Sequence, residues 1–266
     1  MILEDTPIEK HSIKSKTFYV KREDLYSQYP APSLSKLRGI KKLLEKLDPE
    51  KIKTIGVVDT RISKSGWGVT YLCLNTKFKV KCFYPQLKND KGLPYPQFMT
   101  ESLGGKIVPI PAGRINIVYS KAKKLMEKEK GYLLPMGLIL KETMEEVSKV
   151  INLEYEKYKT IVVSLGTGTI CAGIIKGCIE NNLYPDFYGV SCGMSLERIK
   201  KRMESLLGNT LGENIKLIPP AYEYYDTEDM NCGFPSSKYY DKKAFIWMLK
   251  NYAKLKKPIL FWNIGV

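Results

Sequence analysis

The sequence has no apolar run of the roughly 18 residues that a membrane-spanning helix needs. Its first residues, Met1-Ile2-Leu3-Glu4-Asp5, have neither the basic start nor the apolar centre of a secretory signal. It also contains no internal repeat and no low-complexity segment. With 44% apolar and 11% aromatic residues, it has the composition of a globular chain. We therefore expect a cytoplasmic protein with no membrane partner.

Metal ligands are also scarce, because the chain has a single histidine, His11, and no Cys-x-x-Cys pair. A zinc site is therefore not expected, and no metal is assigned. Several of the cysteines lie in apolar segments, which is typical of reduced core residues in a cytoplasmic protein. The 6 cysteines are Cys73, Cys82, Cys171, Cys178, Cys192 and Cys232.

Arginine is rare, although the formal net charge is +15. Such a charge suits a polyanionic partner, yet contacts to base edges favour arginine, and the lysines are spread along the chain among glutamates. A small-molecule substrate is therefore preferred, and nucleic acid is kept as an alternative partner. The arginines are Arg22, Arg38, Arg61, Arg114, Arg198 and Arg202.

One stretch carries the clearest chemical signal: Ser164-Leu165-Gly166-Thr167-Gly168-Thr169. It follows the β-branched run Ile161-Val162-Val163, a predicted strand, and leads into a predicted helix over 171–180. Glycines let the backbone approach a ligand, threonines add hydroxyl groups, and the helix contributes free N–H groups and the positive end of its dipole. The pattern predicts an anion cradle, most simply for a phosphate; the alternative is an ordinary strand-to-helix turn.

Lys36 opens a second predicted helix, in which Leu37, Ile40, Leu43 and Leu44 recur at helical spacing. A lysine in the first helical turn faces the unfavourable end of the dipole. It is therefore either solvated or adapted for chemistry that uses its neutral form.

Strands and helices are predicted to alternate in two series, which indicates an α/β fold with parallel sheets. Each series has a loop rich in glycine and hydroxyl groups at the end of a strand, 59–68 and 164–169. A ligand between the two units would meet both loops. The predicted strands are 17–20, 54–58, 78–84, 106–110, 160–164, 187–191, 215–218 and 258–262, and the helices are 36–44, 66–74, 95–103, 116–130, 140–158, 171–180, 196–207 and 240–255.

A long aromatic loop over 222–239 separates the last predicted strand of the second series from its last helix. Loops of that length in compact domains are often functional, but a simple surface excursion explains it equally well.

Taken together, several segments resemble the fold-type II pyridoxal-phosphate enzymes of the tryptophan synthase beta superfamily. The branch they resemble is that of 1-aminocyclopropane-1-carboxylate deaminase and D-cysteine desulfhydrase. The segments occur in the family's order over nearly the whole chain. They are Thr6-Pro7-Ile8, Val20-Lys21-Arg22-Glu23-Asp24-Leu25, Ser35-Lys36-Leu37-Arg38-Gly39, Ser65-Gly66-Trp67-Gly68, Gly166-Thr167-Gly168-Thr169, Tyr239-Tyr240-Asp241 and Phe261-Trp262-Asn263-Ile264-Gly265.

The resemblance implies pyridoxal 5'-phosphate as cofactor, bound between a larger domain, residues 1–35 and 140–266, and a smaller one, 36–139. It also implies a homodimer, and it assigns a role to each of several residues. Lys36 would form the Schiff base, and the cofactor phosphate would be held by Gly166, Thr167, Gly168 and Thr169. Ser65 would face the ring oxygen and the substrate carboxylate. Asn263 would pair with the ring nitrogen, and Tyr240 would face the substrate.

Two departures from the family pattern bear on the reaction. Gly66 stands where the family loop carries an asparagine, so Ser65 or a backbone N–H would take its place. The carboxyl end reads Asn263-Ile264-Gly265-Val266 where the family has Thr-Gly-Gly. A neutral amide beside the ring nitrogen leaves that nitrogen unprotonated, which favours β-elimination or replacement.

These features favour a lyase of the deaminase or desulfhydrase kind that acts on a small amino acid, with Lys36, Ser65 and Tyr240 as catalytic residues. One alternative keeps the cofactor but uses an amino-acid-bearing modified nucleic acid as substrate, which would explain the charge of +15. A second alternative is a catalytically degenerate homologue that binds a ligand without turnover.

Overall fold

The computed structural model describes residues 2–89, 91–111 and 114–265, which fold into two compact units. Unit 1 comprises Met1–Gln28, Ser33–Ser35 and Lys141–Val266. Unit 2 comprises Tyr29–Pro32 and Lys36–Leu140. In the part of the chain that the structure describes, no helix has the length and apolar character needed to cross a membrane.

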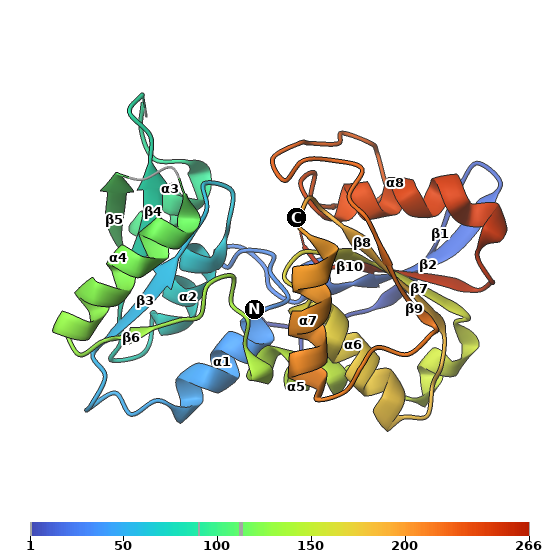
Figure 1. The fold of residues 1–266 in the computed structure, drawn as a ribbon, viewed down its shortest axis with the longest axis horizontal. Coiled ribbons are helices and arrows are strands. Elements are labelled where there is room, and N and C mark those ends of the chain that lie inside the picture. The colour runs from blue at the N-terminus through green and yellow to red at the C-terminus, as the bar shows by residue number, and fades with distance from the viewer. Residues whose placement is uncertain (1, 90, 112–113, 266) are drawn as a thin grey trace. The chain divides into compact units, whose positions relative to one another are not determined.

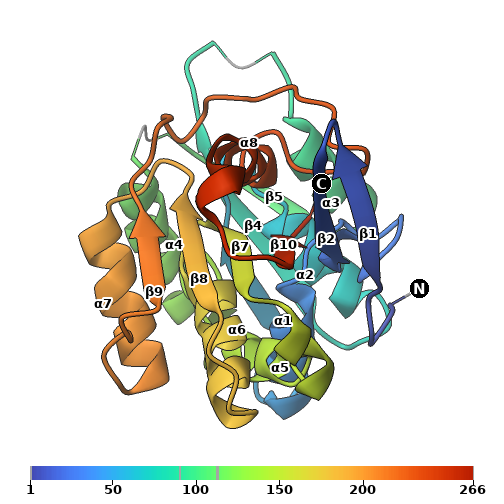
Figure 2. The same cartoon turned by 90° about the vertical axis from the view of Figure 1, so that its right-hand side faces the viewer.

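Unit 1 is built on a six-stranded sheet with the order β1-β2-β10-β7-β8-β9 (Figure 2). All pairs are parallel except β1 and β2, which are joined by only Lys14 and Ser15 and are therefore antiparallel. The strands are β1 (Ile8–Ile13), β2 (Lys16–Arg22), β7 (Thr160–Leu165), β8 (Asp186–Ser191), β9 (Ile215–Ile218) and β10 (Ile259–Asn263).

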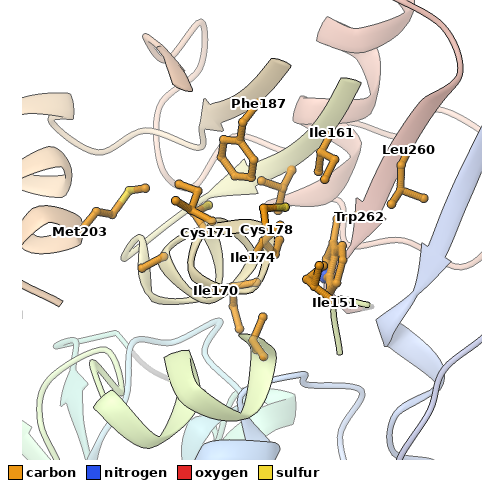
Figure 3. Packing of buried hydrophobic residues seen from close by; sticks show 14 of the residues in the cluster. Ile151, Ile161, Ile170, Cys171, Ile174, Cys178, Phe187, Met203, Leu260 and Trp262 are labelled. Carbon is orange, nitrogen blue, oxygen red and sulfur yellow. The ribbon is translucent and has the colours of Figure 1, made fainter. Parts of the chain in front are cut away.

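Helices cover both faces of this sheet, because its central strands are buried on both sides. In β10, Trp262 packs with α5, α6 and α7, whereas its neighbour Phe261 packs with α8 on the opposite face. Figure 3 shows Trp262 and Ile151 on the α6 side of the sheet. The helices are α5 (Lys141–Ser148), α6 (Thr169–Glu180), α7 (Leu196–Leu207) and α8 (Asp241–Asn251), with short 3-10 turns at η1 (Glu23–Leu25), η2 (Leu153–Lys157) and η3 (Tyr252–Lys254).

Unit 2 is a parallel four-stranded sheet with the order β5-β4-β3-β6 (Figure 1). Its core lies between the sheet and α4, where Val118, Ala122 and Met126 are buried. The strands are β3 (Thr54–Val58), β4 (Lys79–Gln86), β5 (Lys106–Pro111) and β6 (Tyr132–Leu133), and the helices are α1 (Leu37–Lys46), α2 (Ser65–Cys73), α3 (Tyr95–Ser102) and α4 (Ile115–Lys128).

The structure corrects three sequence-based expectations. The helix expected over 140–158 ends at Ser148. The chain then forms the 3-10 turn η2, which Asn152 caps by accepting a hydrogen bond from the Glu154 N–H. The helix expected over 240–255 is α8 followed by η3. Strands β1 and β6 were not expected, since β1 is half polar and β6 has two residues.

A buried aspartate joins three elements at the carboxyl end of the unit 1 sheet. Asp241, the first residue of α8, accepts a hydrogen bond from the Ser164 hydroxyl in β7 at 2.6 Å and one from the Gly265 N–H beyond β10 at 3.3 Å. Burial, with a further contribution from the nearby Asp24, raises the pKa of Asp241 to about 7. Its charged form is therefore tolerated at a cost in stability.

We predict that this aspartate makes unit 1 less stable as the pH rises. A carboxyl group whose pKa is higher in the folded state than in the unfolded state favours folding while it is protonated, and that benefit is lost between about pH 4 and pH 7. The loss is up to about 4 kcal/mol, since each pKa unit corresponds to about 1.4 kcal/mol. Urea unfolding across this range should show a shallower pH dependence for Asp241→Asn than for the wild type.

The matched control is Asp229→Asn, which alters a fully exposed aspartate in the same unit. Its unfolding free energy should follow the wild-type pH dependence. Identical slopes for Asp241→Asn and the wild type would contradict the prediction.

Candidate functional site

The glycine–threonine turn between β7 and α6 is an open loop of backbone that we call the cradle, residues 166–169. β7 is buried along its whole length and delivers the chain to the carboxyl edge of the sheet. Gly168 is the N-cap of α6 with a φ of +89°. A Cβ atom at Gly168 would lie 2.7 Å from Met203 Cγ, so both the backbone angle and the packing against α7 require glycine there.

The other glycine of the cradle faces open space. A Cβ atom built on Gly166 would meet no heavy atom of the described residues within 4 Å. Gly168, the N-cap of α6, provides no side-chain capping hydrogen bond within the described chain, and the positive end of the helix dipole lies at this turn. The hydroxyls of Thr167 and Thr169 lie 3.2 Å apart at the same turn. The cradle therefore fits a phosphate group.

Arg202 supports the cradle from α7. Its Nη1 donates to the Thr167 carbonyl at 3.1 Å, and burial lowers the pKa of the guanidinium from its usual value. Arg202 was not predicted from the sequence, because nothing in its spacing within the basic helix distinguishes it from its neighbours. A fixed positive group beside the turn adds to the attraction for an anion.

Asn263 lies at the end of β10, at the same edge of the sheet as the cradle, because β10 pairs with β7 through Trp262 and Val163. The Asn263 side chain is fully buried, and its Nδ2 donates to Asp24 Oδ1 and to the Pro235 carbonyl, each at 2.8 Å. Its Oδ1 has no hydrogen-bond donor among the described residues. The structure thus brings Asn263 and the cradle to one edge, as the predicted roles require.

Tyr240 precedes α8 in unit 1, where its hydroxyl lies 2.8 Å from that of Tyr224 in the aromatic loop. The buried Lys243 fixes this loop: its Nζ donates to the carbonyls of Glu223 at 2.7 Å and of Cys192 at 3.4 Å. Burial lowers the pKa of Lys243. The loop is therefore held in place near its start, and the substrate-facing role of Tyr240 stays a prediction.

In unit 2, Lys36 is the N-cap of α1, and its Nζ donates to the Gly137 carbonyl at 2.6 Å. The amine is thus held by a backbone carbonyl of the same unit. Its role as the Schiff-base lysine stays a prediction.

Ser65 begins α2 in unit 2 and lies 2.9 Å from the Ser63 hydroxyl. Both belong to a loop that the buried Asp59 fixes, by accepting from Ser63 Oγ at 2.7 Å and from the Gly66 N–H at 2.8 Å. Burial raises the pKa of Asp59 to about 6. This loop, 59–68, was predicted from the sequence without a role for Asp59, whose place directly after strand β3 was the available signal.

Comparisons with known proteins agree with this architecture. The chain is 36% identical to "Glycyl-dTMP PLP-dependent decarboxylase" of Pseudomonas phage M6 over 282 aligned positions, covering 100% of both proteins. No protein-family model matches. Among solved structures, an ACC deaminase homologue superposes with a TM-score of 0.78 and 18% identity, covering 98% of this chain and 89% of that one. O-ureido-L-serine synthase superposes with a TM-score of 0.72 and 14% identity over 98% and 89%.

The two solved structures show the fold, and they confirm the expected tryptophan synthase beta-like α/β class. The phage relative aligns with the whole chain at an identity that establishes common membership. The expected fold-type II resemblance is therefore confirmed. This chain belongs to the fold-type II pyridoxal-phosphate-dependent enzymes, in one family with the phage decarboxylase.

Proposed function

We propose that this chain is a pyridoxal-phosphate-dependent decarboxylase that acts on an amino-acid group carried by a thymidine nucleotide. The observation that carries the proposal is the 36% identity to a glycyl-dTMP decarboxylase over 100% of both chains. In such a reaction the bond between the α-carbon and the carboxylate breaks, carbon dioxide leaves, and a proton takes its place. This substrate differs from the small amino acid preferred from the sequence. It is nearer to the alternative, an amino-acid-bearing modified nucleic acid, but its carrier is a single nucleotide.

The residues of unit 1 suit the cofactor. The cradle presents backbone N–H groups, a helix N-terminus and an open side at Gly166, which match a phosphate group. The buried Oδ1 of Asn263 lacks a donor within the described residues, which a ring nitrogen bearing a proton would supply. When bound, pyridoxal phosphate supplies an electron sink for the charge that decarboxylation leaves on the α-carbon.

In unit 2, Lys36 is the residue we propose as the covalent anchor for the cofactor, since its Nζ is held by a carbonyl at 2.6 Å. The N-terminus of α2, with the Ser65 and Ser63 hydroxyls 2.9 Å apart, offers donors to an oxygen of the cofactor or to a substrate carboxylate. Asp59 keeps those donors in place through its hydrogen bonds to Ser63 and to the Gly66 N–H.

The charge of the chain favours a substrate that carries phosphate. The loops after β3, β4 and β5 all leave the carboxyl edge of the parallel sheet in unit 2, where α/β proteins bind ligands. These loops concentrate positive side chains on that edge, and the chain as a whole has a net charge of +15. The basic residues in them are Arg61, Lys64, Lys88, Lys91 and Arg114.

Two glycine substitutions should separate cofactor binding from folding. In Gly166→Ala the added methyl group enters open space at the cradle, so stability should stay unchanged while pyridoxal phosphate affinity falls more than about tenfold, or about 1.4 kcal/mol. In Gly173→Ala the methyl group would lie 2.6 Å from Val147 Cβ between α5 and α6. This variant should lose about 1–3 kcal/mol of stability and keep its cofactor affinity.

Urea unfolding of the cofactor-free proteins and titration with pyridoxal phosphate measure the two quantities. Wild-type cofactor affinity in a folded Gly166→Ala protein would refute the assignment of the cradle.

Lys36→Ala should abolish the covalent attachment of the cofactor, because the variant lacks the amine that we propose forms the Schiff base. Borohydride reduction of the wild-type holoenzyme, followed by peptide mass spectrometry, should place the cofactor on the peptide that contains Lys36. Lys41→Ala, which removes an exposed lysine from the same helix, is the control and should keep the attachment. A cofactor found on any other lysine would exclude the proposed role.

Substrate choice is tested by the release of carbon dioxide. Glycyl-dTMP should be turned over with a kcat/KM at least about 100-fold above that for glycine, or about 2.7 kcal/mol of transition-state stabilisation. The reaction should weaken as sodium chloride is added, because the phosphate contacts are electrostatic. Release of ammonia or sulfide from small amino acids, with no carbon dioxide from the nucleotide, would instead support the deaminase or desulfhydrase alternative.

A further inference from the structure

The buried amide of Asn263 has an oxygen without a hydrogen-bond partner among the described residues. The side chain is 0% exposed, and Oδ1 receives no hydrogen bond from the described residues. A buried acceptor without a donor costs about 1–3 kcal/mol, which a ligand that donates a hydrogen bond would offset. Asn263 ends a central strand, two residues beyond the fully buried Phe261.

The surroundings allow only one orientation of this amide. Nδ2 lies 2.8 Å from Asp24 Oδ1 and 2.8 Å from the Pro235 carbonyl oxygen. Both atoms are acceptors, so exchanging the amide nitrogen and oxygen would set acceptor against acceptor at both contacts. Both hydrogens of Nδ2 are therefore used inside the protein, and Oδ1 can act only as an acceptor toward a ligand.

Arg22 fixes the position of the Asp24 side chain. Its Nε donates to Asp24 Oδ1 at 2.9 Å and its Nη2 to Asp24 Oδ2 at 2.8 Å, a bidentate ion pair. The same guanidinium donates to Glu9 Oε2 at 2.6 Å, and His11 Nε2 lies 3.0 Å from that oxygen. Asp24 also raises the pKa of the buried Asp241. The ion pair with Arg22 thus fixes the Asp24 carboxylate where it accepts from Asn263 Nδ2.

The position of this acceptor matches the cradle. β10 lies beside β7 in the unit 1 sheet, with Trp262 paired to Val163, so Asn263 and the start of the cradle leave adjacent strands at the same edge. Asn263 Oδ1 is thus a buried acceptor at the edge of the sheet that carries the cradle, and pyridoxal phosphate has one ring nitrogen that can donate to such an acceptor when it is protonated.

We infer that Asn263 Oδ1 accepts a hydrogen bond from the protonated ring nitrogen of pyridoxal phosphate, with Asp24 and Arg22 as positioning residues. This inference rests on the proposed function, and it reverses the expectation drawn from the sequence that an amide leaves the nitrogen unprotonated. An amide can present either N–H or oxygen, and here the protein has fixed the oxygen. A protonated ring is a stronger electron sink than a neutral ring. It therefore suits the loss of a carboxylate better than it suits β-elimination.

The test reads the ring nitrogen directly. Wild-type holoenzyme is prepared with pyridoxal phosphate labelled with 15N in the ring, and its nitrogen chemical shift is measured at mildly alkaline pH. The protonated and free-base forms of the labelled cofactor in solution serve as references. The bound signal should lie at the protonated position. A signal at the free-base position would overturn the inference even if every variant failed to fold.

Variants identify the residues responsible. Asn263→Ala should move the signal to the free-base position, and Asn263→Asp, which restores an acceptor, should return it to the protonated position. Asp24→Asn should produce a partial shift, because an amide at residue 24 can donate and lets Asn263 turn. Thr160→Val is the control: it removes another buried hydroxyl without a partner in the described chain, from the opposite end of β7, and should leave the signal unchanged.

The outcomes separate this inference from the proposed function. Bound cofactor with a neutral ring in the wild type, or a protonated ring that persists in Asn263→Ala, overturns the inference and leaves the decarboxylase proposal standing. A protein that binds no pyridoxal phosphate overturns both.

Discussion

Two buried aspartates hold the carboxyl edge of the unit 1 sheet together. Asp241 ties the end of β7 to the start of α8 and to the chain beyond β10, and Asp24 ties Arg22 to Asn263. A buried carboxyl group must be hydrogen-bonded, so these contacts leave little freedom in where the strands end. The cradle and the amide of Asn263 lie at this edge and are therefore held in fixed positions. A site that positions a small cofactor requires such fixed groups.

The local structure around the cradle could be predicted because its signals lie within about twenty residues of sequence. A β-branched run, a glycine–threonine turn and a helix follow one another, and the structure places β7 and α6 where the sequence predicted them. The order of the matching segments also predicted the family, which the comparison with the phage protein confirmed. The roles of Lys36, Ser65 and Tyr240 stay predictions, because they depend on a bound substrate or cofactor.

The direction in which Asn263 faces could not be predicted, because it is decided by residues far away in the sequence. Asp24 is separated from Asn263 by 239 positions, and the Ser164 partner of Asp241 lies 77 positions away from it. Read alone, the amide is ambiguous between donor and acceptor, and the chemistry inferred for the ring depends on which it is. The role of Arg202 was not predicted for the same reason, since the Thr167 carbonyl to which it donates lies 35 positions away.

The open side of Gly166 has an evolutionary consequence. Because no heavy atom of the described residues lies within 4 Å of a Cβ built at Gly166, natural selection for folding alone would not preserve the glycine. A single-base change in a glycine codon gives alanine, so a gene copy released from its catalytic duty could lose the anion site in one step and still encode a stable protein. In pseudoenzymes that descend from such a gene copy, the first substitutions would therefore lie at positions where a ligand, and not a neighbouring side chain, requires a small residue.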